Sequence, residues 1–139
     1  MSDYDPQNIF GKILRGEIPA HKVFEDANVL AMMDIFPQTK GHLLVIPKAP
    51  SRNLLDADPA VLATAIAYVQ RLAIAAKKAL GADGVRVAQF NEASAGQTVF
   101  HLHFHIIPIY LNAELAPHAG GKADDGELAA QAKAIAAAL

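Results

Sequence analysis

The chain has 139 residues, no cysteine, six histidines and a formal net charge of −2. This length is sufficient for one domain with its own core, and a hydrophobic share of 53 % argues against disorder. The lack of cysteine excludes disulfides and thiolate metal sites, and the near-neutral charge gives no basic field for long nucleic acid. The N-terminal residues do not resemble a signal peptide, and no apolar run approaches the roughly 18 residues of a membrane span. We therefore expect a cytoplasmic protein with no membrane segment and no long nucleic acid as partner.

The first third of the chain predicts a short helix followed by strands. Asp5-Pro6 has the sequence of a helix start, and apolar residues at helical spacing follow it up to a stop at Gly16. Short apolar runs bounded by turn residues then predict three strands, at residues 22–25, 29–34 and 42–47. The short connections between these strands predict antiparallel pairing.

The rest of the chain begins with a long helix that opens at Asp58-Pro59 and stops at Gly81. The apolar stripe predicted for this helix comprises Leu62, Ile66, Val69, Ala73, Ala76 and Leu80. The elements expected after it are a strand at 85–91, a polar turn at 91–96, a long strand at 98–109, a loop at 117–126 and a helix at 127–139.

Together these elements predict an α+β fold. Its centre would be an antiparallel sheet of about five strands with the long helix packed on one face, accompanied by a short N-terminal helix and a C-terminal helix. We expect a single domain over residues 1–139. Residues 1–7 are expected to be flexible, and residues 112–139 to form a variable C-terminal extension.

Three histidines alternate with apolar residues inside the predicted final strand. Because alternate side chains of a strand share a face, His101, His103 and His105 should form a row with about 6.5 Å between neighbours. The residues expected to point the other way, into the core, are Phe100, Leu102, Phe104 and Ile106. Three imidazoles on one sheet face are costly to bury without partners, which points to a functional site.

Two kinds of chemistry fit this row. Two strand histidines can bind a metal ion, but the third would lie about 13 Å from the first, so a carboxylate would have to complete the ligand set. Alternatively, a neutral imidazole can act as a nucleophile at pH 7. Gly96-Gln97-Thr98 precedes the row, and its backbone N–H groups and hydroxyl could cradle an anion. No lysine or arginine lies between Gln89 and Lys122, which favours a small phosphate ester over a polyanion.

The segment His101-Leu-His103-Phe-His105-Ile-Ile resembles the motif that names the histidine-triad (HIT) superfamily, in which histidines alternate with apolar residues. The likeness covers most of the chain, in the segments Ile9-Phe10, Ile13, Gly16-Glu17-Ile18-Pro19, Val23-Phe24-Glu25-Asp26, Asp34-Ile35, Gly41-His42-Leu43-Leu44-Val45-Ile46-Pro47-Lys48, Asn91-Glu92 and Gly96-Gln97-Thr98-Val99-Phe100. The chain is most similar to the Hint/bacterial HIT branch, which is protein kinase C inhibitor-like.

The resemblance implies a nucleotidyl hydrolase or transferase that attacks the α-phosphorus of nucleoside 5′-phosphoryl compounds, such as purine nucleoside phosphoramidates or adenylylated compounds. His103 would be the nucleophile that forms a nucleotidyl-histidine intermediate, and His105 would contact the phosphate or the bridging atom. His101 and His42 would complete the histidine set that orients the nucleophile. The substrate-binding residues would be Asp34 at the ribose, Ile35 near the base, and Asn91, Gly96, Gln97 and Thr98 at the phosphate. The expected partners are an AMP- or GMP-like small molecule and a second copy of the chain, bound through the long helix and a strand.

The chain also departs from its relatives. Asn8, Gly11 and Pro50 stand where zinc-bearing relatives place ligands, so we expect no metal and no cofactor. Ile109 stands where many relatives have an arginine. The alternatives are a catalytically weak nucleotide-binding or scaffold protein, a dinucleoside polyphosphate hydrolase, and a mononuclear metalloprotein that uses two of the triad histidines.

Overall fold

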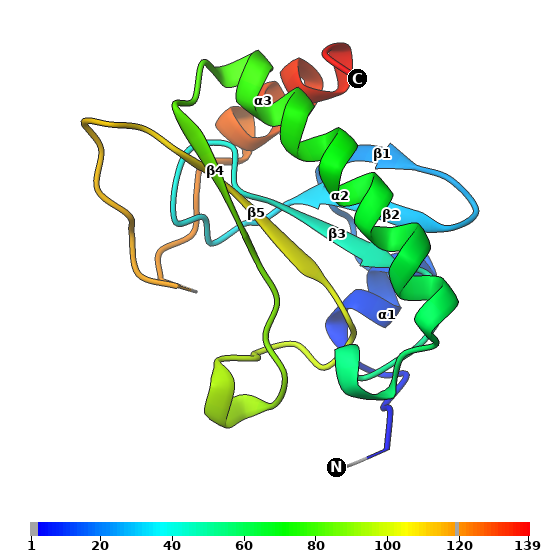
Figure 1. The fold of residues 1–139 in the computed structure, drawn as a ribbon. Helices are drawn as coiled ribbons and strands as arrows, with labels where there is room; N and C mark the ends of the chain where they lie inside the picture. The colour runs from blue at the N-terminus through cyan, green and yellow to red at the C-terminus, as the bar shows by residue number, and fades with distance from the viewer. Residues whose placement is uncertain (1–2, 119) are drawn as a thin grey trace.

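The structure, a computed structural model, describes residues 3–118 and 120–139. Its centre is a five-stranded antiparallel sheet in the order β1-β2-β3-β5-β4 (Figure 1). The strands are β1 (Lys22–Glu25), β2 (Val29–Met33), β3 (Leu43–Pro47), β4 (Gly84–Ala88) and β5 (Phe104–Ile109). The helices are α1 (Ile9–Leu14), α2 (Pro59–Leu80) and α3 (Asp125–Ala137), with single 3-10 turns η1 (Leu54–Asp56) and η2 (Ala93–Ala95). The expected α+β architecture is therefore confirmed.

The long helix α2 packs on one face of the sheet. Asp58 caps its start by accepting a hydrogen bond from the Ala60 backbone N–H, and Gly81 ends it at a φ of 64°. Its buried residues are Ala65, Val69, Leu72, Ala75 and Ala76. The predicted stripe is wrong at Ile66, whose exposed fraction is 54 %. By length and composition alone α2 could also cross a membrane, with a mean hydropathy of 1.4, but a helix packed on a sheet passes the same test.

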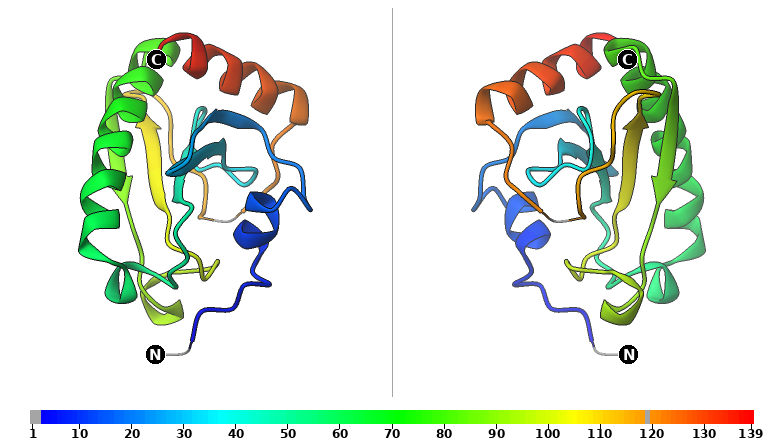
Figure 2. Two further views of the ribbon diagram at one scale, coloured as in Figure 1. Left: turned by 90° about the vertical axis from the view of Figure 1, so that its right-hand side faces the viewer. Right: turned by 90° about the vertical axis from the view of Figure 1, so that its left-hand side faces the viewer.

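The short helix α1 covers the opposite face of the sheet (Figure 2). Its Phe10 and Ile13 form a second apolar cluster with residues of β2 and β3. The predicted cap at Asp5 is wrong, because Asn8 accepts the hydrogen bond from the Gly11 backbone N–H at 2.8 Å. Asp5 instead accepts from the Gln7 backbone N–H, in a turn that precedes the helix. Two apolar layers therefore lie on the two faces of one sheet.

The last strand is shorter than predicted, because β5 begins at Phe104 rather than at residue 98. β5 pairs with β3 only as far as Val45, and the carbonyl of Pro47 accepts a hydrogen bond from the His101 ring instead of a strand neighbour. Residues 98–103 therefore form an irregular segment. Phe100 lies under the guanidinium of Arg52 at 4.2 Å and not in the core. The expected core positions Leu102, Phe104 and Ile106 are confirmed.

Candidate active site

A pocket of about 170 Å³ opens on the α1 side of the sheet. It is lined by Ile9, Phe10, Ile13, Ile18, Pro19, Ala20, Met32, Met33, Asp34, Ile35, Phe36, Leu44, Thr98, Val99, His103, His105 and His118. Most of these side chains are apolar, which suits a flat organic ring, and the five polar ones are of types that bind hydroxyl and phosphoryl groups. Of the predicted site residues, the pocket brings together Asp34, Ile35, Thr98, His103 and His105.

His103 presents one ring nitrogen to this pocket. Its Nδ1 lies 2.7 Å from the backbone carbonyl oxygen of His101. A carbonyl oxygen only accepts, so Nδ1 carries the hydrogen and Nε2 keeps a free lone pair. The ring packs edge-on against Phe10, and burial lowers the pKa of His103 to about 4. At neutral pH the side chain is therefore an uncharged imidazole in the tautomer that a nucleophile requires.

His105 lies at the end of a hydrogen-bonded chain. The backbone N–H of Gln38 donates to His42 Nδ1 at 3.0 Å, so the hydrogen of His42 is on Nε2. That N–H faces His105 Nδ1 at 2.9 Å, which places the hydrogen of His105 on its own Nε2. Burial is the main cause that lowers the pKa of His42 to about 4 and the pKa of His105 to about 2, so both rings are neutral.

His105 offers the pocket a hydrogen-bond donor, the N–H at its Nε2. Its Nε2 is buried and has no hydrogen-bond partner among residues 3–118 and 120–139. The rings of His103 and His105 are 5.0 Å apart. A nucleophilic nitrogen and an unpartnered N–H donor therefore lie side by side, as nucleophilic attack on a phosphoryl group requires.

His101 contributes through its backbone rather than its ring. The His101 Nε2–H donates to the carbonyl of Pro47 at 2.7 Å, and the hydroxyl of Tyr4 donates to Nδ1 at 2.7 Å. The Asn8 amide in turn donates to the Tyr4 hydroxyl at 3.0 Å. The expected row of three rings on one face therefore does not extend to His101: its ring is fixed outside the pocket, and its carbonyl orients His103.

The hydrogen bond between Tyr4 and His101 also concerns two other expectations, the flexibility of residues 1–7 and the positions of zinc ligands. Through this contact, part of the segment expected to be flexible is attached to the irregular segment before β5. Asn8, where the resemblance led us to look for a zinc ligand and to find none, is joined here to His101 by the Tyr4 hydroxyl.

Asp34 follows β2 directly and lines the pocket next to Ile35. Its Oδ1 accepts a hydrogen bond from the Phe36 backbone N–H at 2.8 Å, and its Oδ2 lies 3.4 Å from His42 Nε2. Burial raises the pKa of Asp34 and lowers that of His42, so this contact joins a carboxyl group to a neutral ring and is not an ion pair. A carboxyl group in an apolar pocket is a suitable acceptor for ribose hydroxyls.

Asp34, His42 and His105 also have the spacing of a metal site. Their ligand atoms lie within 4.8 Å of one another. However, His42 Nε2 and His105 Nδ1 already share a hydrogen bond, which an ion between them would break. We therefore interpret this cluster as a hydrogen-bonded chain. It uses one triad histidine together with His42, and not two triad histidines as the metalloprotein alternative supposed.

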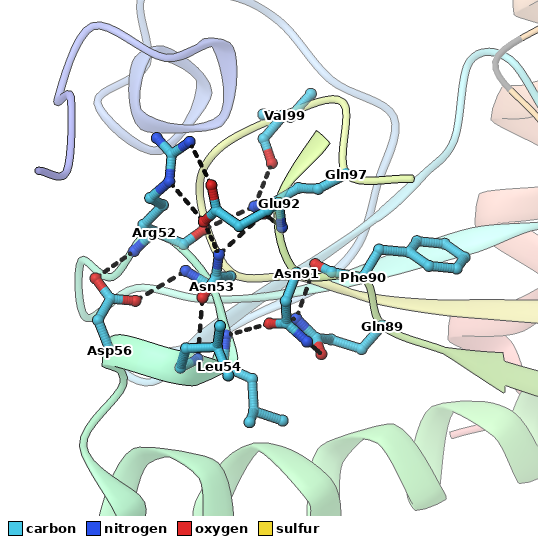
Figure 3. A network of polar contacts seen from close by, with 11 residues as sticks. Arg52, Asn53, Leu54, Asp56, Gln89, Phe90, Asn91, Glu92, Gln97 and Val99 are labelled. Atoms are coloured by element: carbon cyan, nitrogen blue, oxygen red, sulfur yellow. Dashed lines mark hydrogen bonds and ion pairs between the residues drawn. The ribbon is translucent and has the colours of Figure 1, made fainter. Parts of the chain in front are cut away.

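The loop before the histidines is held by a network of polar contacts (Figure 3). Arg52 donates to both carboxylate oxygens of Glu92, at 2.8 and 2.9 Å, and the Asn53 amide donates to the same carboxylate at 2.6 Å. Glu92 has a φ of 75°, a conformation that is unfavourable for a residue with a side chain. The hydrogen bonds from Arg52 and Asn53 to the Glu92 carboxylate stabilise this conformation.

Gln97 belongs to this network rather than to the pocket. Its amide donates to the carbonyls of Arg52 and Val99, and its Oε1 accepts from the Glu92 backbone N–H (Figure 3). Both amide hydrogens are used, so the expectation that this side chain donates to a phosphate is wrong. Its role in the structure is to hold the loop.

The other three predicted phosphate ligands have different positions. Asn91 accepts a hydrogen bond from the Leu54 backbone N–H and exchanges hydrogen bonds with Gln89, so it also braces the loop (Figure 3). Gly96 has a φ of 103° and ends η2, which turns the chain toward Thr98. Thr98 is the one that lines the pocket, among the residues that the structure describes.

One polar pocket residue has no counterpart among the predicted site residues. His118 comes from the chain between β5 and α3, and its ring lies 5.3 Å from that of His105. A lone histidine in an irregular segment carries no periodic signal, so His118 could not be placed here from the sequence.

The pattern of the HIT domain family matches residues 15–111. The chain belongs to the HIT domain family. A HIT-like protein of Bartonella henselae, described as involved in cell-cycle regulation, is 54 % identical, with a TM-score of 0.95 over 99 % of this chain and 100 % of that one.

Two further relatives carry chemical descriptions. A zinc-bound histidine triad family protein of Mycobacterium smegmatis is 36 % identical, with a TM-score of 0.84 over 95 % of this chain and 92 % of that one. The adenylylsulfatase HINT3 of Arabidopsis thaliana is 41 % identical over 100 residues, which are 72 % of this chain and 51 % of that protein. One of these relatives is therefore named for an enzyme activity and the other for a bound metal.

Proposed function

We propose that this protein is a nucleotidyl hydrolase or transferase that acts on the α-phosphorus of nucleoside 5′-phosphoryl compounds. The substrate class that we favour is purine nucleoside phosphoramidates or adenylylated compounds. The observation that carries the proposal is the hydrogen bond from His103 Nδ1–H to the His101 carbonyl, which leaves Nε2 free in the pocket. The adenylylsulfatase relative supports the adenylyl part of this class.

The proposed reaction has two displacement steps. In the first step His103 Nε2 attacks the phosphorus, a P–N bond forms to the ring, and the bond to the leaving group breaks. The His105 Nε2–H donates a hydrogen bond to the leaving atom, which takes up a proton from solvent as it departs. In the second step water attacks the same phosphorus and releases a proton to solvent, the P–N bond to His103 breaks, and the nucleoside monophosphate leaves.

The nucleoside of the substrate would bind in the apolar part of the pocket. Ile9, Phe10 and Ile13 of α1 form one wall, and Ile35 and Phe36 lie beyond the end of β2. These apolar walls suit a purine ring. Asp34 lines the same pocket next to Ile35, in a position to accept the ribose hydroxyls. The base would therefore lie against α1, with the phosphoryl group at His103.

The test is hydrolysis of a fluorogenic adenosine phosphoramidate by the purified protein. We expect release of AMP and amine in equal amounts and catalytic turnover. A panel that adds adenylyl sulfate and a dinucleoside polyphosphate compares the leaving groups. Tight AMP binding without turnover of any substrate would contradict the proposal and would support a nucleotide-binding scaffold instead.

We further propose that the protein is a homodimer. Ile66 and Ile74 on α2 and Val87 on the sheet-edge strand β4 have exposed fractions of 54, 62 and 48 %. Large apolar side chains on an unpaired edge strand and its neighbouring helix are typical of an interface. Light scattering should give the mass of a dimer, and the double variant Ile74→Asp/Val87→Asp should give that of a monomer. The control is Leu115→Asp, at an exposed leucine next to Ala116, which is hydrogen-bonded to Gln38. A monomeric wild type would contradict the proposal.

A further inference from the structure

The proposed chemistry uses His103 and His105 but leaves His118 without a role. His118 lines the same pocket and is the one lining residue that the chain between β5 and α3 contributes, within the described part of the chain. Figure 2 shows this chain, in orange, on the side of the sheet that carries α1, opposite α2. A segment 13 residues beyond His105 therefore returns to the pocket.

Hydrogen bonds hold this segment in place. The Ala116 backbone N–H donates to the carbonyl of Gln38 at 2.8 Å, and the Gln38 side-chain amide donates back to the Ala116 carbonyl at 3.2 Å. Gln38 is also the residue whose backbone N–H starts the chain to His42 and His105. Beyond the pocket, the Ala123 N–H donates to the carbonyl of Ile35 at 2.9 Å. The segment that carries His118 is therefore attached to the loop that positions the site histidines.

The ring of His118 is packed against aromatic neighbours. It lies 5.3 Å from the ring of His105 at an angle of 69°, and 5.7 Å from the ring of Phe90. Phe90 is itself 5.4 Å from His105. The three rings therefore contact one another, and the pocket histidines form a row in the order His103, His105, His118, with 5.0 Å and 5.3 Å between neighbouring rings.

His118 and His105 share an unusual feature. The Nε2 atom of each ring is buried without a hydrogen-bond partner among residues 3–118 and 120–139. Buried polar atoms are normally paired, because leaving one unpaired costs its full desolvation. Two such atoms on adjacent rings in one pocket indicate that a ligand supplies their partner.

The chemistry of the pocket suggests what that partner is. Lysine and arginine are absent from the described lining residues, so a phosphoryl group must be bound by neutral donors and imidazoles. We propose that His118 is a substrate-contacting residue that binds a phosphoryl oxygen of the nucleotide beside the one held by His105. This inference rests on the proposed function, because it assumes a nucleoside phosphate in this pocket.

Calorimetric binding of AMP and of adenosine separates the roles that His118 could have. We expect His118→Ala to weaken AMP binding about tenfold or more and to leave adenosine binding unchanged, because adenosine has no phosphoryl group. His118→Gln retains an N–H donor and should recover part of the loss. The matched control is Leu115→Ala, which alters the same segment outside the pocket and should leave both affinities unchanged.

The outcomes distinguish this inference from the proposed function. If wild-type protein binds AMP no more tightly than adenosine, the phosphate site itself is wrong. If wild-type protein prefers AMP and His118→Ala retains that preference, His118 does not contact the phosphoryl group and the inference is overturned. Equal losses for AMP and adenosine would also overturn it, because His118 would then be a wall of the nucleoside pocket. Thermal melting of each variant checks that its fold is retained.

Discussion

Replacement of His103 by alanine or glutamine is expected to lower kcat/KM for an adenosine phosphoramidate by a factor of at least about 10⁴. Both substitutions remove the only ring nitrogen in the pocket, among the described residues, whose lone pair is fixed by a hydrogen bond on the other side of its ring. Glutamine fills a similar volume and keeps a polar group, so it separates the loss of the nucleophile from the loss of packing against Phe10.

The control for this prediction is His21→Ala. His21 is a histidine outside the pocket that contacts Asp125 at the start of α3, and its removal should leave kcat/KM nearly unchanged. AMP binding should survive in His103→Gln, because Asp34, His105 and the apolar wall remain. A variant that retains more than about one hundredth of the wild-type rate would contradict the role of His103.

The pH dependence of the rate tests the same residue. Burial lowers the pKa of His103 to about 4, so its lone pair is present at pH 7 and is lost only as the pH falls through about 4. kcat/KM should therefore stay nearly constant from pH 7 down to about pH 5 and then decline. A decline centred near 6.5, the pKa of an ordinary imidazole, would show that the nucleophile is not buried as the structure describes.

The second large effect is expected at His105, where alanine should lower kcat by about 10²- to 10³-fold. This substitution removes the N–H donor next to the nucleophile but leaves the hydrogen bond that orients His103. The nucleotidyl adduct on His103 should still form, more slowly. The measurement is kcat for the same phosphoramidate.

A double-mutant cycle of His42 and His105 tests the role of His42. His42 contacts His105 and does not line the pocket, so it acts by fixing which nitrogen of His105 carries the hydrogen. His42→Ala should therefore cost about tenfold alone and nothing further in the His105→Ala background. Additive losses would show that His42 acts on the substrate by a separate route.

The parts of the fold that depend on residues close together in the sequence could be predicted. The cap at Asp58, the proline after it and the stop at Gly81 bound α2 as expected. The start of β5 could not be predicted, because alternation continues through residues 98–103 while the strand does not. What ends the pairing is a contact from His101 to the carbonyl of Pro47, 54 residues away in the sequence, and no local pattern encodes it.

The candidate site, too, could be predicted from the sequence only in part. Residue types and spacing identified His103 and His105, the resemblance to the HIT family added Asp34, and the pocket brings the three together. Gln97 was misassigned because an amide at this position can either donate to a phosphate or stabilise the loop. Only its hydrogen bonds to the carbonyls of Arg52 and Val99 show that it stabilises the loop. His118 was missed because its place depends on how the chain after β5 returns to the sheet.

The central claim is that the nucleotidyl group is transferred to His103 Nε2, and peptide mapping of a quenched reaction tests it most directly. The protein is mixed with an adenosine phosphoramidate, quenched within one turnover at alkaline pH, digested and analysed by mass spectrometry. We predict one adenylyl group, carried by His103 and absent from His103→Gln. An adenylyl group on another residue, or turnover with no adduct on the protein and inversion of configuration at phosphorus, would contradict the account.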